Sequence, residues 1–410
     1  MVPNGWSKQR ISDILERVVK PVKPIEDTYY REIGIRSHGK GIFHKEKVTS
    51  SEIGNKRVFE VIENAFVVNI VFAWEQAIAK TTHEELGFIA SHRFPQFLPK
   101  DGRCDIDYLV YFFKTPKGKY LLELASPGGA GRNKTLGQKE FDRLELVLPP
   151  VPEQRKIAQI LSTWDKAIAT TEKLIDASKQ QKKALMQQLL TGKKRLIDPE
   201  TGKAFEGEWE TGQFDKLFNI EIGGTPSRSN ETYWDDKLET NNNWLSIADL
   251  KGKSISHTKE RISDLGVAKS NVSLIPKGTI VMSFKLTIGR RAFLNIDTYT
   301  NEAICALLIK DKDKLDNNYL YQALEIVDFE QEIDQAVKGK TLNKAKLKRL
   351  KLLMPSVKEQ QKIASVLTAA DNEVELLEAK LAHLKQEKKA LMQQLLTGKR
   401  RVKVVETEAA

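Results

Sequence analysis

The chain has 410 residues, a formal net charge of +11 and 40% hydrophobic residues, enough for two or three domains with buried cores. Its two cysteines exclude a disulfide framework and fit a reducing cytosol, and the absence of any run of 18 apolar residues excludes a predicted membrane span. The N-terminal stretch shows no signal-peptide pattern. The basic excess favours nucleic acid as a partner, although lysines on solvated helix faces produce the same excess.

Residues 1–150 are predicted to form a first globule of mixed α+β type. Apolar runs at 59–74, 108–113 and 120–125 indicate strands, and Gly-rich and Pro-rich turns separate them. The segment Ser7 to Val19 is predicted to be helical.

A first helical spacer is predicted at 151–195, because a proline cluster precedes a long helical pattern from Glu153 to Leu190. Thr191-Gly192 ends that pattern, as glycine often does after the last apolar turn. The polar, basic residues 196–207 are predicted to be a linker.

A second globule is predicted at 208–355. Strands are expected at 243–250, 278–284 and 304–310, and a helix from Leu315 to Val337. A second helical spacer follows at 356–401, with its long helix from Lys358 to Leu396, and 402–410 form a polar tail.

An internal repeat relates the two spacers. The run KKALMQQLLTGK occurs at 182–193 and again at 388–399, and 23 of the 43 positions from 153 to 195 match those 206 residues further on. Outside the spacers, Trp6 and Trp209 open the two globules at similar places, but the middles of the globules share little. A tandem duplication of this kind predicts pseudo-two-fold symmetry, with a shared scaffold and two different faces.

Heptad spacing in both helices predicts a seam between them. Steps of three and four residues carry the apolar positions of the second helix over more than four heptads, whereas Thr171, Ser178 and Lys182 interrupt the first helix. Pseudo-symmetry makes the pair antiparallel. The seam residues are Ile157, Leu161, Ile168, Leu185, Leu189, Ile363, Leu367, Val374, Leu377, Leu381, Leu384, Leu391 and Leu395.

The length of the helices bears on their use. A helix of about 38 residues is roughly 55 Å long at ~1.5 Å per residue. Paired half-sites on B-DNA are commonly ~34–36 Å apart. A stiff rod between two basic globules can therefore act as a ruler on DNA, although a helical hairpin or a homodimeric coil without such a purpose gives the same periodicity.

Sequence motifs for catalysis are absent. The chain has no GxGxxG after a strand, no GxxxxGK[ST] and no Asn-Pro-Pro-aromatic motif, and its six histidines lack metal-ligand spacing. No catalytic or metal site is therefore predicted. The Gly-rich, basic segment Ser126–Lys134 fits a loop that approaches a DNA backbone, and it fits a plain structural turn equally well.

Candidate DNA-contacting residues gather in turn-rich stretches of both globules. Arginine can pair bidentately with guanine, and lysine mostly neutralises phosphates. For any single residue plain solvated charge is the simpler reading, so the prediction concerns the set. It comprises Arg36, Lys40, Lys45, Lys47, His92, Arg93, Arg132 and Lys134 in the first globule, and Arg228, Lys251, Lys253, Lys285, Arg290, Arg291, Lys338, Lys340 and Lys344 in the second.

Taken together, these features resemble the specificity subunit of type I restriction–modification systems, over the whole chain. The most specific segments are the repeat ends ALMQQLLTGK and the repeat starts LPPVPEQRKIAQIL (148–161) and MPSVKEQQKIASVL (354–367). Further matching segments are GIRSHGKGIFHKEKV (34–48), AWEQAIA (73–79), FIASHRFPQF (88–97), WLSIADLKG (244–252) and GTIVMSFKLTIGRRAF (278–293).

The resemblance implies an α+β fold in which two globular mixed α/β target-recognition domains are joined by two long antiparallel coiled-coil helices. Each domain would read one half of a split, asymmetric DNA site in double-stranded DNA. The helices would set the gap and dock two methyltransferase subunits, with restriction/translocase subunits joining them. It implies no cofactor in this chain, with S-adenosylmethionine, ATP and Mg in the partner subunits, and a cytoplasmic role in prokaryotic phage defence.

Two other classes of function stay open on the residues alone. A fused nuclease or methyltransferase would turn over substrate or bind S-adenosylmethionine as an isolated chain. A coiled-coil scaffold that binds only proteins would lose nothing when the loop arginines are neutralised.

Overall fold

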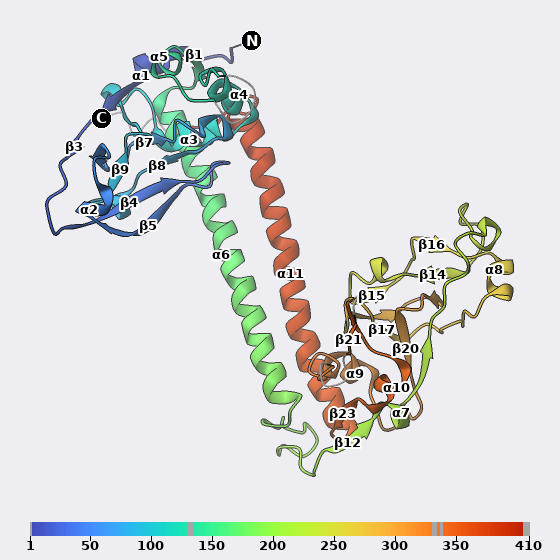
Figure 1. Ribbon diagram of the computed structural model, residues 1–410. Coiled ribbons are helices and arrows are strands. Elements are labelled where there is room, and N and C mark those ends of the chain that lie inside the picture. Colours follow the sequence, from blue (N-terminus) through green and yellow to red (C-terminus); the bar gives the residue numbers. More distant parts are fainter. Residues whose placement is uncertain (1, 129–133, 330–333, 337–338, 405–410) are drawn as a thin grey trace. The chain divides into compact units, whose positions relative to one another are not determined.

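The computed structural model describes residues 2–128, 134–329, 334–336 and 339–404. The chain divides into two compact units, each of which takes part of both long helices (Figure 1). Unit 1 holds residues 1–173 and 379–410, and unit 2 holds 174–378. In the part of the chain that the structure describes, no helix is both long and apolar enough to cross a membrane.

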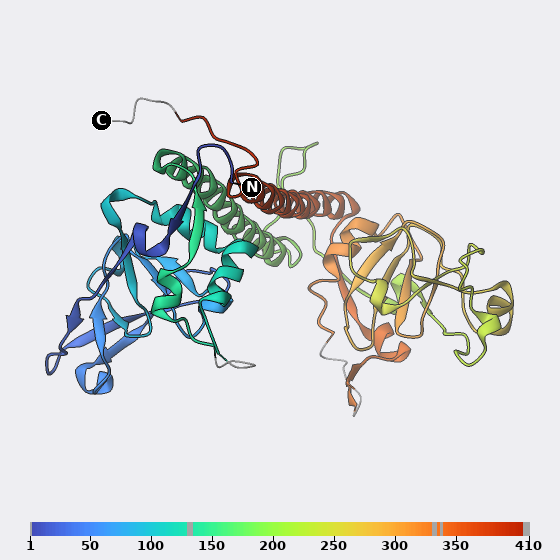
Figure 2. The ribbon, with the colours of Figure 1, turned by 90° about the horizontal axis from the view of Figure 1, so that it is seen from above.

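The globular part of unit 1 contains three sheets and short helices, and it lies on one side of α6 (Figure 2). Its core combines Phe66, Phe97, Phe113 and Phe141 with Ile157 of the long helix α6. The sheets are β1-β11, β2-β10-β7-β8 and β3-β6-β9-β4-β5. The strands are β1 Ser7–Arg10, β2 Leu15–Val18, β3 Pro21–Val22, β4 Tyr29–Ile35, β5 Ile42–Thr49, β6 Val58–Glu60, β7 Phe66–Val68, β8 Ile78–Lys80, β9 Ile89–Ser91, β10 Gln96–Pro99 and β11 Glu145–Leu148. The helices are α1 Ile11–Ile14, α2 Ser50–Ile53, η1 Ala73–Glu75, η2 His83–Glu85, η3 Lys100–Gly102, α3 Ile106–Phe113, α4 Pro116–Leu124, α5 Gln138–Asp142 and α6 Val151–Leu189.

The globular part of unit 2 is built around one five-stranded sheet. Its sheets are β12-β23, β13-β20-β17-β18-β15, β16-β14-β19 and β21-β22. The strands are β12 Glu210–Gln213, β13 Phe218–Ile222, β14 Asn243–Leu245, β15 Ser254–Ile255, β16 Glu260–Arg261, β17 Ile280–Ser283, β18 Arg291–Leu294, β19 Tyr299–Thr300, β20 Ile304–Ile309, β21 Asp334–Ala336, β22 Gly339–Thr341 and β23 Lys351–Met354. The helices are α7 Phe214–Leu217, η4 Glu231–Tyr233, η5 Ile247–Asp249, α8 Asp264–Lys269, α9 Asn317–Ala323, α10 Lys344–Arg349 and α11 Val357–Leu395.

Two strand predictions in the first globule are wrong. Residues 108–113 lie in α3 and residues 120–124 lie in α4. Capping decides both cases, since Asp105 accepts a hydrogen bond from the amide of Tyr108 (2.8 Å) and Thr115 caps α4 with Pro116 at its first position. A short apolar run alone does not distinguish a buried helix from a strand.

Other predictions hold in part. The predicted helix at 7–19 is wrong except for the single turn α1, because strands β1 and β2 flank that turn. The predicted strand at 59–74 breaks into β6, β7 and η1, and 243–250 into β14 and η5. The helix expected from Leu315 to Val337 is limited to α9, and part of that range lies outside the described residues. The strands expected at 278–284 and 304–310 are confirmed as β17 and β20, and both long helices are confirmed.

The two units share a common scaffold around their helices. In unit 1, β1 pairs antiparallel with β11, with Ser7 opposite Leu148. In unit 2, β12 pairs antiparallel with β23, with Glu210 opposite Met354. In each unit the first strand of the pair is followed by one helical turn, α1 or α7, and then by a strand of a larger sheet, β2 or β13. The repeat seen in the sequence therefore extends into the edges of both globules.

Within each unit, one half of α6 lies antiparallel to one half of α11. In unit 1 the ammonium group of Lys388 lies 2.5 Å from a carboxylate oxygen of Asp165, and Lys385 pairs with Glu172 at 2.7 Å. In unit 2 Lys182 pairs with Asp371, and Lys179 with Glu378 at 2.6 Å. The predicted fold class, two mixed α/β domains with a long antiparallel helix pair, is confirmed.

The same side chains fasten the globule to the start of its helix in both units. The side-chain oxygen of Gln154 accepts from the amide of Asp105 at 2.9 Å, and that of Gln360 accepts from the amide of Asp316 at 2.8 Å. Both glutamine side chains are buried. Since Asp105 and Asp316 cap α3 and α9, each glutamine fixes a globule helix to a spacer helix.

A second joint connects the globule to both long helices at once. In unit 1, Tyr111 of α3 donates its hydroxyl hydrogen to Asp165 at 2.7 Å, on the carboxylate that also pairs with Lys388. Burial raises the pKa of Tyr111, so the hydroxyl stays protonated as a donor. In unit 2 the equivalent Asp371 accepts from Gln322 of α9 at 2.8 Å.

The seam residues are buried or half-buried along both helices. Ile157, Leu161, Leu189, Ile363, Leu367 and Leu395 are buried, and the other predicted seam residues are half-buried. Two of the polar interruptions have partners. Thr171 donates to the carbonyl of Ala167 within α6 at 2.8 Å, and Lys182 pairs with Asp371 of α11. This burial supports the predicted heptad seam.

Candidate nucleic-acid interface

In unit 1 the turn between β4 and β5 is held against the short helix η1. The amides of His38 and Gly39 donate to the carbonyls of Glu75 and Gln76 at 2.6 and 2.8 Å. The hydroxyl of Ser37 donates to the Glu75 carboxylate at 2.8 Å. The turn is therefore a fixed loop, and the predicted residues Arg36 and Lys40 project from it as exposed side chains.

Several of the predicted cations gather around this turn. Arg36 lies over the ring of Phe43 at 4.8 Å and donates to the carbonyl of Ile42 at 3.1 Å. Lys134 lies over the ring of Trp74 in η1 at 5.6 Å, which brings a distant segment to the same place. Elsewhere on β5, Lys47 is exposed and Lys45 pairs with Glu32 at 2.9 Å.

The remaining predicted residues of unit 1 form a second group or fall outside the description. His92 and Arg93 are exposed in the turn between β9 and β10, where the amide of His92 donates to the carbonyl of Arg57 at 3.2 Å. Arg132 lies outside the described residues.

In unit 2 four predicted residues line one cleft of about 740 Å³, namely Lys251, Lys253, Arg290 and Arg291. Its wall also includes Tyr321 of α9 and Glu325, together with Lys182, Asp371 and Glu375 from the long helices. The cleft therefore lies where the globular part of unit 2 meets its helices. Its mixture of five cations with three carboxylates leaves it positive.

The cations of the cleft differ in their exposure and in the contacts they make within the globule. Arg291 is only 11% exposed, donates to the carbonyl of Tyr321 at 2.6 Å and pairs with Glu325 at 2.7 Å. Its guanidinium group is thus engaged within the globule. Lys253 lies 5.9 Å from the centre of the Tyr321 ring, while Lys251 and Arg290 are exposed.

The other predicted residues of unit 2 lie at separate points. Lys285 lies in the turn after β17, with its ammonium group 5.4 Å from the centre of the Phe284 ring, and Lys344 is exposed at the first position of α10. Lys338 lies outside the described residues, as does the side chain of Lys340 in β22.

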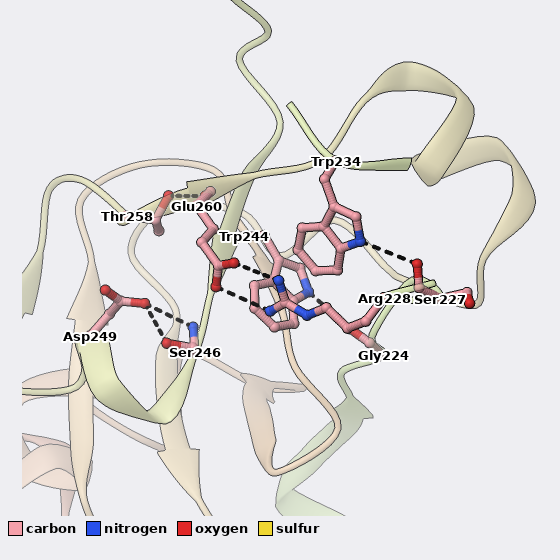
Figure 3. A network of polar contacts seen from close by, with 9 residues as sticks. All are labelled: Gly224, Ser227, Arg228, Trp234, Trp244, Ser246, Asp249, Thr258 and Glu260. Atoms are coloured by element: carbon pink, nitrogen blue, oxygen red, sulfur yellow. Dashed lines mark hydrogen bonds and ion pairs between the residues drawn. The ribbon is translucent and has the colours of Figure 1, made fainter. Parts of the chain in front are cut away.

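Arg228 occupies an aromatic box (Figure 3). Its guanidinium carbon lies 3.6 Å from the ring centre of Trp234 and 4.9 Å from that of Trp244, and the two rings meet edge to face. Two of its nitrogens donate to the carboxylate of Glu260 at 2.5 and 3.1 Å. The donors that would read a guanine are occupied by the globule itself, so this geometry favours a structural role for Arg228.

Replacing Arg228 by alanine is expected to lower the stability of unit 2 by about 1–2 kcal/mol, because two cation–π contacts and a half-exposed ion pair are lost together. The emission of Trp234 and Trp244 should shift, since the charge over their rings disappears. Urea unfolding followed by tryptophan fluorescence measures both effects. Lys259→Ala, which removes an exposed cation beside Glu260, serves as the control and should change neither.

One lysine beside the β4–β5 turn could not be selected from the sequence as a candidate. Lys114 packs its side chain against Gly39 at the β4–β5 turn and lies 5.7 Å from the Tyr111 ring centre. Burial lowers the pKa of Lys114, and the charge of Lys388 acts in the same direction while Asp165 opposes it. Nothing in the spacing of this lysine distinguishes it from a solvated one, so only the fold reveals it.

Among the described residues no cluster of three or more His, Cys, Asp or Glu side chains could hold a metal ion. Burial raises the pKa of both cysteines, Cys104 and Cys305, to about 12, which leaves the thiols protonated and unreactive.

The chain contains two α+β globules that share the same supporting elements but differ in the segments that hold their exposed cations. This arrangement defines a class of proteins with two recognition domains. The chain belongs to the family of type I restriction modification DNA specificity domains, whose model matches residues 3–179 and again residues 206–386. Membership makes it a specificity subunit and not an enzyme.

Relatives and solved structures agree with this assignment. The chain is 24% identical to the putative type I restriction enzyme MjaX specificity subunit of Methanocaldococcus jannaschii, over 98% of this chain and 95% of that protein. It is 26% identical to the MjaVIII specificity subunit of the same organism, over 98% and 94%. Its fold is similar to the HsdS subunit from Thermoanaerobacter tengcongensis (TM-score 0.54, 17% identity, 97% and 98% coverage) and to the S subunit from M. genitalium (TM-score 0.59, 14% identity, 96% and 99% coverage).

Proposed function

We propose that each globular domain reads one half of a split, asymmetric site in double-stranded DNA, and that the helix pair sets the gap between the halves. The observation that carries this proposal is the contrast within the repeat. The scaffold is shared between the units down to equivalent hydrogen bonds, while the segments between scaffold elements differ and hold the exposed cations. A duplicated scaffold with two different faces fits two different half-sites.

The candidate contacts follow from the geometry of the two faces. In unit 1 they are the fixed β4–β5 turn with Arg36 and Lys40, together with Lys134, and the turn with His92 and Arg93. In unit 2 they are the cleft cations Lys251, Lys253 and Arg290, together with Lys285. Cations of this kind would supply phosphate contacts and base contacts, and such binding weakens steeply as salt rises.

The same proposal covers the partners. Two modification subunits would dock on the helices and carry S-adenosylmethionine for adenine methylation, and restriction subunits would supply ATP- and Mg-dependent translocation and cleavage. The protein would act in the cytoplasm of a prokaryote. Leu174 and Leu376 support a docking role for the helices, since they are 48% and 72% exposed on α6 and α11.

Co-expression with a cognate modification subunit tests the proposal. Mapping of methylated adenines across the host genome should give a single split motif with a fixed gap, and the motif should vanish when this chain is omitted. Methylation without a motif, or methylation that does not depend on this chain, would favour a scaffold that binds only proteins.

A further inference from the structure

The turn between β17 and β18 carries a leucine in an unfavourable conformation. Leu286 has φ +63 and is 67% exposed. The left-handed region favours glycine, and an exposed leucine gains nothing from burial. Glycine would suit both the backbone and the surroundings of this position better, so the leucine has no evident purpose within the folded chain.

The base of the turn holds this conformation. The amide of Ser283 donates to the carbonyl of Arg290 at 2.8 Å, and the amide of Gly289 donates to the carbonyl of Ser283 at 2.9 Å. The amide of Thr287 donates to the carbonyl of Lys285 at 2.8 Å, inside the turn. All three are backbone bonds, so the conformation of the turn does not depend on the side chain of Leu286, which is exposed.

Two cations, Lys285 and Arg290, belong to the same turn as the leucine. Lys285 precedes it, and the same turn contributes Ile288, Gly289 and Arg290 to the wall of the positive cleft that also contains Lys251 and Lys253. An exposed apolar side chain in a turn that also carries cations suits a polyanion that displays apolar groups within a groove. Double-stranded DNA is such a partner, since the thymine methyl group is the apolar group on its major-groove edges.

A second leucine provides a contrast. Leu238 has φ +56 and is 46% exposed in the same unit. Its neighbours in the sequence are Asp235, Asp236, Lys237 and Glu239. The carboxylates outnumber the lysine, and this acidic excess would repel a phosphate backbone. The carbonyl of Leu238 accepts from Arg261 at 2.6 Å, which gives that turn a structural use. The conformation alone is therefore no sign of DNA contact, and the charge around Leu286 makes the difference.

We propose that Leu286 contacts a thymine methyl group in the major groove of the half-site read by unit 2, while Lys285 and Arg290 contact the flanking phosphates. This inference rests on the proposed function. Leu286 would be a specificity-determining residue, because its side chain can distinguish thymine from the other bases only through the methyl group.

The test uses the full chain in complex with its modification subunits and the duplex target found by methylation mapping. Leu286→Gly should weaken target binding about tenfold, a size in keeping with the burial of a leucine side chain. Its thermal stability should be unchanged or raised, because the backbone strain is relieved. The matched control Leu238→Gly should relieve the same strain and leave affinity unchanged.

Substitution of deoxyuridine for thymine locates the contact. At one position of the half-site the loss of the methyl group should weaken binding of the unaltered complex about tenfold and should not weaken binding of Leu286→Gly further. Undiminished affinity of Leu286→Gly, indifference to deoxyuridine at every thymine of the half-site, or a half-site without thymine would each overturn the inference. If the unaltered complex shows no sequence preference at all, the proposed function itself has failed.

Discussion

Replacing Leu367 by aspartate is expected to destabilise unit 2 by about 4 kcal/mol or more, enough to unfold it under mild conditions. Leu367 is fully buried on α11 in a cluster with Met186, Tyr319 and Leu350. The new carboxylate would stand among apolar side chains without a partner, and the packing of the leucine would be lost as well. Urea unfolding followed by circular dichroism and tryptophan fluorescence measures the loss.

The same helix supplies a matched control. Leu376 is 72% exposed, so Leu376→Asp makes the same chemical change on α11 and should leave the unfolding midpoint within experimental error. Under the proposed docking of modification subunits, Leu376→Asp should instead weaken assembly of the complex. Equal unfolding midpoints for Leu367→Asp and the unaltered chain would contradict the packing described for unit 2.

The long helices and the repeat could be predicted from the sequence because their signals are periodic and extend over many residues. The equivalence of Asp165 with Asp371 and of Lys182 with Lys388 is visible in the sequence, and the structure pairs Asp165 with Lys388 and Asp371 with Lys182. An ion pair between two helices is favoured wherever an antiparallel alignment brings opposite charges together.

Short elements within the globules could not be predicted in the same way. The run from Tyr108 to Phe113 is apolar at every position, so it has no period, and its helix depends on the cap at Asp105 and on burial against Phe141. The strands β1 and β2 are each four residues long, and α1 between them is one turn. Tertiary pairing with β11 and β10 determines these elements more than local preference does.

The candidate interface shows a similar division. Exposed cations such as Lys251 and Arg290 could be proposed from turn-rich segments, and the fold brings them to one cleft. The sequence could not show that Arg228 lies between two tryptophans, or that Arg291 donates to a backbone carbonyl. These assignments depend on contacts between segments far apart in the chain, which spacing does not reveal.

Replacing Glu359 by glutamine is expected to destabilise unit 2 by about 3 kcal/mol. Glu359 is fully buried and receives two hydrogen bonds from Arg195 at 2.7 Å each and a third from the indole of Trp209 at 3.2 Å. An amide has a single acceptor oxygen, and its NH₂ group would face a donor of the guanidinium group. Arg195, itself only 24% exposed, would keep a charge without a counter-ion.

The repeat contains its own comparison in Glu153, which receives two hydrogen bonds from Arg401 at 2.7 Å each. Arg401 is 43% exposed, so solvent can compensate its charge after Glu153→Gln. Trp6 stands where unit 2 has Trp209, but its buried indole nitrogen has no hydrogen-bond partner among the described residues, so Glu153 receives no third bond from it. Glu153→Gln should therefore cost only about 1–2 kcal/mol. Urea unfolding of both variants measures the difference, and an equal or larger loss for Glu153→Gln would mean that burial of the arginine does not govern the strength of this clamp. The two arginine–glutamate pairs match in sequence and in their bidentate geometry. The difference in unfolding free energy between the two variants therefore reports the contributions of burial and of the tryptophan hydrogen bond.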